Sequence, residues 1–193
     1  HECPRDQPGK RETAFTNCFL TTSSNNAVVT LWSPFGDEAP PTKLQVFGLD
    51  NPSPSYLLDI CYGPGPPDGP PPSLFVLMAD QEDGKLFAWH LESEWQEQSV
   101  VTLVGCDYVV PFVASFPMYS WSTQVHPAAD ISEDELTDQG GLIFDMKLFS
   151  YQSTVVQCLT LTSFMCLPPE NQWSPATPGI RVEDLQHDGD SLV

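Results

Sequence analysis

The side chains that could carry out catalysis are few and scattered. His90, in the segment Ala88–Glu94 (AWHLESE), could bind a metal ion or transfer a proton, and Glu92, Glu94 and Glu97 could form an acid–base pair of the glycosidase kind. Histidines inside strands are more often hydrogen-bonded packing residues, and with 26 acidic residues some carboxylates lie close together by chance. The signatures of serine hydrolases, zincins and nucleotide-binding loops do not occur in the sequence. We therefore predict a protein that is not an enzyme and has no catalytic residue, metal site or cofactor.

The cysteines are the second group of reactive side chains. Their number is even, and they lack the C-x-x-C spacing that is typical of zinc sites, which favours about three disulfides over free or metal-bound thiols. Because disulfides persist in oxidising compartments, we expect an extracellular protein, either secreted or the ectodomain of a cell-surface receptor. Six thiols allow fifteen pairings, among which the spacing does not choose. The six are Cys3, Cys18, Cys61, Cys106, Cys158 and Cys166.

The charge of the chain limits its partners. It carries 26 acidic and 7 basic residues, for a formal charge of -19, so its long-range field repels phosphate backbones and anionic lipids. No run approaches the roughly 20 apolar residues that span a bilayer. We therefore expect no nucleic-acid partner and no direct membrane insertion by this segment. Basic proteins, or apolar surfaces that tolerate acidic surroundings, are better partners.

Aromatic residues gather in one part of the chain. Trp89, Trp95, Tyr108, Phe112 and Phe116 fall within a short span, and partly exposed aromatic side chains contribute much of the binding energy at protein interfaces. For any one of them, a place in the core is the better explanation. For the group as a whole, we expect at least one to anchor an interface.

The elements that position these residues are predicted to be strands. Clusters of proline and glycine separate short apolar segments, which indicates a mostly β fold with little helix. Leu74–Ala79 and Leu86–Leu91 are the arms of a predicted hairpin, and the acidic tract Asp80–Gly84 is its turn. Both arms are almost continuously apolar. This favours central strands covered on both faces, or an arm whose outer face awaits a partner.

Further strands are predicted after the hairpin. Ser99–Val104 and Asp107–Val113 have strand composition, with Gly105 and Cys106 as a tight turn or bulge between them, and Pro111 places its strand at a sheet edge. In the segment Leu142–Phe149, every second residue from Leu142 to Leu148 is apolar and shares one face.

The predicted helix content is small, and the end of the chain has a different composition. The pattern Ser132–Glu135 has the form of a capping box and predicts one or two helical turns. Residues 167–193 are rich in proline and acidic residues, so we predict a linker or disordered tail after a single β domain at residues 1–166.

Two stretches carry a family resemblance. The run Ser73–Glu94 (SLFVLMADQEDGKLFAWHLESE), followed by Val101–Val110 (VTLVGCDYVV), resembles the orphan-region domains of endoglin and betaglycan, the co-receptors of the transforming growth factor-β superfamily. Trp121, the Ser132 turn with Glu135-Leu136, and the segment LIFDMKL then follow in the order typical of that family. The resemblance spans roughly Cys3 to Cys166.

The resemblance implies a fold and a partner. The fold would be two antiparallel sheets, in a sandwich or clam-like arrangement around one short helix, stapled by disulfides that include Cys3–Cys18. The partner would be a dimeric cystine-knot growth factor of the bone morphogenetic protein or transforming growth factor-β class, the former favoured, together with the signalling receptors of that pathway. The binding edge would map to the strands between Trp95 and Phe112. Its predicted contact residues are Trp95, Gln98, Val100, Thr102, Tyr108, Val110 and Phe112.

Two other functions fit the composition. The acidic charge suits a secreted decoy that sequesters basic cytokines or chemokines, and a steep loss of affinity with added salt would favour it. The third possibility is a structural extracellular module that self-associates, which size-exclusion chromatography would detect.

Overall fold

The computed structural model describes most of the strands predicted from the sequence. It covers residues 14–15, 18–32, 40–50, 55–63, 73–96, 100–114, 117–127, 143–152, 155–167 and 180–184. The capping box Ser132–Glu135 and Cys3 lie outside the described residues.

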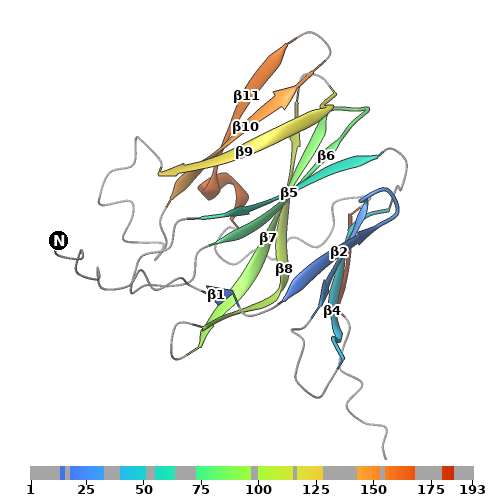
Figure 1. Cartoon of the computed structure of the whole chain (residues 1–193), viewed down its shortest axis with the longest axis vertical. Helices are drawn as coiled ribbons and strands as arrows, with labels where there is room; N and C mark the ends of the chain where they lie inside the picture. Colours follow the sequence, from blue (N-terminus) through green and yellow to red (C-terminus); the bar gives the residue numbers. More distant parts are fainter. Residues whose placement is uncertain are drawn as a thin grey trace, which may run out of the picture.

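The described residues form three β-sheets (Figure 1). The central sheet has the order β1-β8-β7-β6-β5, the second sheet has the order β12-β4-β3-β2, and the third has the order β11-β10-β9. Apart from the parallel pair β1 and β8, all neighbouring strands are antiparallel. The strands are β1 (Ala14–Phe15), β2 (Phe19–Ser23), β3 (Val28–Trp32), β4 (Lys43–Leu49), β5 (Tyr56–Tyr62), β6 (Leu74–Asp80), β7 (Lys85–Gln96), β8 (Val100–Val113), β9 (Ser120–Pro127), β10 (Phe144–Tyr151), β11 (Val156–Thr162) and β12 (Ile180–Asp184).

The central sheet is buried on both faces. All seven residues of β6 are buried, and the six apolar ones divide alternately between two hydrophobic cores. Val76 and Met78 lie in the core that faces the second sheet, with Phe47 and Trp89, whereas Phe75 and Leu77 lie in the core that faces the third sheet. The continuous apolar arms of the hairpin are therefore central strands, as the first of the two alternatives predicted.

The predicted hairpin and its acidic turn are confirmed. β6 and β7 pair from Leu74–Leu91 to Ala79–Leu86. The Asp80 carboxylate accepts hydrogen bonds from the backbone N–H groups of Glu82, at 2.7 Å, and Asp83, at 3.0 Å, which closes the turn. Gly84 follows with φ of 67°, a conformation that glycine adopts without steric cost. The acidic tract Asp80–Gly84 between the two apolar arms is therefore the turn that reverses the chain.

The third sheet covers the opposite face of the central sheet from the second sheet. In β10, Phe144, Met146 and Leu148 are buried alternately, as the sequence predicts, and they pack in the core that faces the central sheet. A short 3₁₀ helix, η1 (Ser163–Cys166), follows β11. Among the described residues no helix is long and apolar enough to cross a membrane.

The mostly β class is confirmed, but two details of the predicted fold differ. There are three sheets, not two, because strands β9–β11 form a layer of their own over the central sheet. Within residues 167–193, the predicted linker or tail, β12 pairs with β4, and its Ile180 and Val182 pack against the core that faces the second sheet. Apolar side chains at every second position therefore hold this short segment on the domain.

Cys61, Cys158 and Cys166 are thiols, of which Cys158 is exposed on β11 and the other two are buried. The preferred pair Cys3–Cys18 cannot be compared, because Cys3 lies outside the described residues.

Candidate binding site at the edge of the central sheet

β8 is the outermost long strand of the central sheet. Its inner side pairs with β7 from Val100 to Val113, whereas its outer side pairs with the short strand β1 only at Val100 and Val101. Of the strands that the structure describes, none pairs with the outer side of β8 between residues 102 and 113. An open strand edge offers peptide N–H and C=O groups to which a partner can add a strand.

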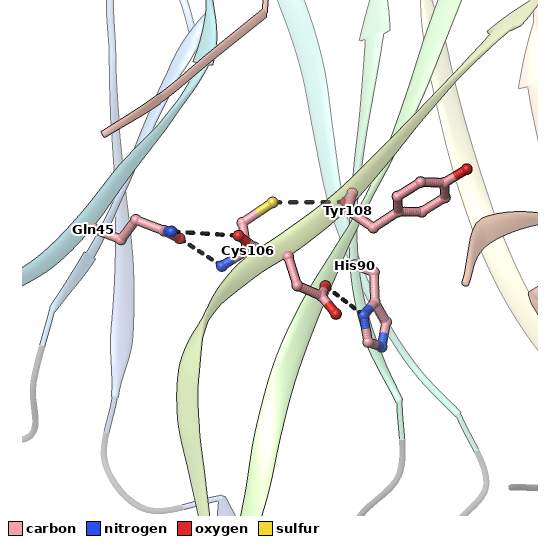
Figure 2. A network of polar contacts seen from close by, with 5 residues as sticks. Gln45, His90, Cys106 and Tyr108 are labelled. Atoms are coloured by element: carbon pink, nitrogen blue, oxygen red, sulfur yellow. Dashed lines mark hydrogen bonds and ion pairs between the residues drawn. The ribbon is translucent and has the colours of Figure 1, made fainter. Parts of the chain in front are cut away.

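One side chain already occupies part of this edge (Figure 2). Gln45, buried on β4 of the second sheet, donates from Nε2 to the carbonyl oxygen of Cys106 at 3.3 Å, and its Oε1 accepts the N–H of the same residue. The amide of Gln45 therefore joins two sheets and divides the edge. The longer uninterrupted part runs from residue 107 to residue 113.

A bulge begins this open part. The register of β7 and β8 changes from His90–Tyr108 to Leu91–Cys106, which leaves Asp107 as the extra residue. Its Oδ1 lies 2.6 Å from His90 Nδ1, and both side chains are largely buried (Figure 2). The His90 ring also contacts Phe75, with the ring centroids 5.2 Å apart. His90 is thus the hydrogen-bonded packing residue that the sequence favours.

His90 and Asp107 do not belong to a metal-binding cluster in the described region. There, no three histidine, cysteine, aspartate or glutamate side chains are grouped so as to hold a metal ion. The unpaired stretch of β8 has the backbone geometry to which an extended polypeptide can add as a strand.

Three of the predicted contact residues lie on the open part of the edge. Tyr108, Val110 and Phe112 alternate along β8, so they share one face of the strand, and all three are half-buried. Phe112 packs against the core that faces the third sheet. They are therefore less exposed than an outward-facing row would be, because the third sheet covers part of that face. The fully accessible apolar residue at this end is Val113, which is 86% exposed.

The other predicted contact residues are not brought to the same place. Trp95 pairs with Val101 at the far end of β7 and β8, beside Val100 and Thr102. The side chains of Trp95, Val100 and Thr102 lie outside the described part of the chain, as does Gln98 altogether. The bulge and the Gln45 bridge separate this end of β8 from Tyr108, Val110 and Phe112.

A cavity of about 550 Å³ adjoins the open part of the edge. It lies where the ends of β4 and β8 meet the β6–β7 turn and β12. Apolar side chains form much of its wall, and carboxylates lie among them. The lining residues are Leu49, Asp50, Tyr56, Asp80, Asp83, Lys85, Phe87, Pro111, Phe112, Val113 and Ile180.

The electrostatics of the cavity are those of an acidic site. Among the described residues of its lining, the one cation is Lys85, which forms an exposed ion pair with Asp83 at 3.0 Å. Burial raises the pKa of the Tyr56 hydroxyl, and the nearby charges of Asp80, Asp83 and Glu82 raise it further. The hydroxyl therefore remains a neutral hydrogen-bonding group at neutral pH, within a field that attracts cations.

Some residues of this site have no signal in the sequence. Gln45 occupies an ordinary strand position, and Ile180 lies in the segment predicted as a tail. The acidic tract Asp80–Gly84 and Pro111 did have a signal, as a turn and as an edge-strand residue. The sequence did not predict that the acidic tract and Pro111 would line the same cavity, because their proximity depends on how the sheets pack.

A scan against protein-family models and searches of curated proteins and of solved structures found no match for this chain.

Proposed function

We propose that this chain is the extracellular ligand-binding domain of a co-receptor for dimeric growth factors of the transforming growth factor-β superfamily, with the bone morphogenetic protein class favoured. The observation that carries the proposal is the open stretch of β8 from residue 107 to residue 113, which ends at an apolar cavity with an acidic wall. The resemblance to the orphan-region domains of endoglin and betaglycan supplies the class of ligand.

The mechanism is non-catalytic. A strand or finger tip of the growth factor pairs with the backbone of β8, and its apolar side chains lose water against Phe112 and Val113. A dimeric ligand presents two equivalent sites, so a receptor held at a cell surface gains avidity and delivers the ligand to the signalling receptors of the pathway. The carboxylates beside the cavity chiefly increase the rate of association.

Val113 offers a sharp test of this site. Because it is 86% exposed, the change Val113→Asp should leave the fold intact while it places a carboxylate in the proposed apolar contact. We expect affinity for a bone morphogenetic protein dimer, measured by surface plasmon resonance, to fall about tenfold or more, which corresponds to about 1.4 kcal/mol.

Val156→Asp is the matched control. Val156 is also an exposed valine on a strand, 67% accessible, but it lies on β11 of the third sheet. Its substitution should change affinity by less than about twofold. If both variants bind like the original chain, the β8 site is wrong. If the original chain binds no member of the superfamily, the proposed ligand class is wrong.

One observation favours a second function, the sequestration of basic cytokines or chemokines. Asp50, Asp80 and Asp83 lie together in the cavity lining, and the chain as a whole has a charge of -19. A charge-driven complex is screened by salt, whereas apolar docking is not. For the co-receptor function we expect the dissociation constant of the growth-factor complex to change by less than about threefold between 50 and 500 mM NaCl. A hundredfold loss of affinity over the same range of salt would favour sequestration.

A further inference from the structure

Two buried thiols lie in the core between the central and third sheets. Cys61, near the end of the outer strand β5, is 3% exposed, and Cys166, the last residue of η1, is completely buried. Both belong to the same hydrophobic cluster although about 100 residues separate them in the sequence. Cys158, by contrast, lies exposed on β11.

An aromatic pair connects the surroundings of the two thiols. Cys61 lies opposite Phe75 in the register of β5 and β6, and the Phe75 ring packs edge-on against Phe144, with the centroids 5.9 Å apart. The backbone N–H of Phe144 donates to Ser163 Oγ at 3.1 Å, which fixes the first residue of η1. Cys166 ends that one-turn helix.

The close approach of β5 to the same ring supports this arrangement. A Cβ atom on Gly63, two residues after Cys61, would lie 2.3 Å from Cε1 of Phe144. The Phe144 ring thus meets the end of β5, and the Phe144 backbone binds the start of η1, so one residue links the two segments that carry Cys61 and Cys166 in the same hydrophobic cluster.

The electrostatics of the two sulfurs agree with this proximity. Burial raises the pKa of each thiol to about 12, and the charge of Cys61 contributes to the rise at Cys166. A charge on one sulfur thus acts directly on the other, so the two groups lie within electrostatic reach across the same apolar core.

We propose that Cys61 and Cys166 form a disulfide in the mature protein. The bond would tie the edge strand β5 of the central sheet to η1, which follows the third sheet, in addition to the hydrogen bond from Thr123 on β9 to Asp59 on β5. This pairing is independent of the proposed function, because it concerns the folding of the domain and not its ligand.

The reaction needs a disulfide-containing oxidant, such as glutathione disulfide or a thiol oxidoreductase. The thiolate of one cysteine attacks the oxidant, releases one reduced thiol and forms a mixed disulfide; the second cysteine then attacks that bond and releases the other thiol. The two protein thiols lose two electrons and two protons, and both are recovered in the two reduced thiols of the oxidant.

The burial of the pair dictates when the bond forms. With pKa values of about 12, only on the order of one thiol in 10⁵ is ionised at pH 7, and the core also excludes the oxidant. Oxidation therefore takes place during folding, before the third sheet covers Cys61. Once formed, the bond is protected from external reductants for the same reason.

The decisive experiment is a peptide map of the protein secreted from eukaryotic cells, alkylated in denaturant at acidic pH and digested without reduction. We expect one linked pair of peptides that contain Cys61 and Cys166. Recovery of either cysteine as an alkylated free thiol, or linked to a different cysteine, would overturn the proposal.

Serine variants give a second, independent measurement. Cys61→Ser and Cys166→Ser should each lower the melting temperature by on the order of 10 °C, because a bond that closes a loop of about 100 residues is lost. The double variant should melt close to the single variants, since all three lack the same bond. Additive losses would contradict the pairing, because they indicate two independent buried thiols.

Thiol reactivity in protein folded under reducing conditions tests whether oxidation must precede closure of the core. Alkylation of Cys61 and Cys166 in the folded protein should be slow at pH 7, because burial raises the pKa of both thiols and the core excludes the reagent. Exposed Cys158 serves as the internal reference for reagent activity. Rapid alkylation of the buried pair at pH 7 would contradict oxidation before closure of the core.

Discussion

Changing Gly48 to alanine is expected to lower the free energy of unfolding by about 3 kcal/mol or more. Gly48 lies on β4 with φ of +155°, a conformation that residues with a side chain rarely adopt. An added Cβ would lie 2.1 Å from the carbonyl oxygen of Ala27 and 2.9 Å from the Cα of Val28. Both contacts are with backbone, so β3 and β4 must separate to admit a methyl group. Equilibrium unfolding in urea measures the loss.

Thr160→Ala is a suitable control for this prediction. Thr160 is exposed on β11, so the removal of its side-chain atoms should change the free energy of unfolding by no more than about 0.5 kcal/mol. A Gly48→Ala variant that is as stable as this control would show that β3 and β4 do not approach each other in the way described.

Changing Gln45 to alanine should cost about 2–4 kcal/mol of stability. The substitution removes both side-chain hydrogen bonds to Cys106 and leaves that residue's buried N–H and C=O without the Gln45 amide. It also leaves a small cavity between the second sheet and β8. Urea unfolding measures the total loss, and hydrogen exchange of the Cys106 amide reports whether the loss is local.

Gln124→Ala removes the same side-chain atoms at an exposed position on β9. It should therefore lower stability by no more than about 0.5 kcal/mol. If the two glutamine variants lose equal stability, the amide of Gln45 does not join the sheets.

The features that were predictable from the sequence depend on contacts between neighbouring segments. The hairpin of β6 and β7 follows from two apolar runs and a turn of acidic residues with glycine, all within 20 residues. Pro111 lacks a backbone donor, so its strand was expected at an edge, and in the described part of the chain the outer side of β8 pairs with just the two residues of β1. The predicted irregularity at Gly105 and Cys106 is confirmed as bulges in the pairing with β7.

The features that were missed depend on contacts between distant segments. β12 contributes only Ile180 and Val182 to a core, too few apolar residues to stand out in a polar segment, yet its pairing with β4 places it in the second sheet. The division into three sheets has the same cause, because alternating apolar residues in β10 show which face is buried but not which sheet covers it.

For the candidate site, the sequence indicated that β8 is an edge strand, but it did not predict the cavity beside that strand. Tyr108, Val110 and Phe112 do lie on β8 of the central sheet, whereas the cavity beside them combines residues from six strands and a turn. Side-chain exposure along β8 is set by the third sheet, which covers part of the face on which we expected contacts. Alternation along a strand predicts which residues share a face and not whether that face meets water.

The position of the central sheet between two others has a consequence for synthesis of the chain. Phe75, Leu77 and Leu86 emerge from the ribosome well before residues 144–161, which supply the layer that will shield them. For the time needed to translate about 60 residues, one apolar face of the nascent central sheet lacks the layer that covers it in the native structure. We therefore expect this protein to need chaperone protection until its last third has been made.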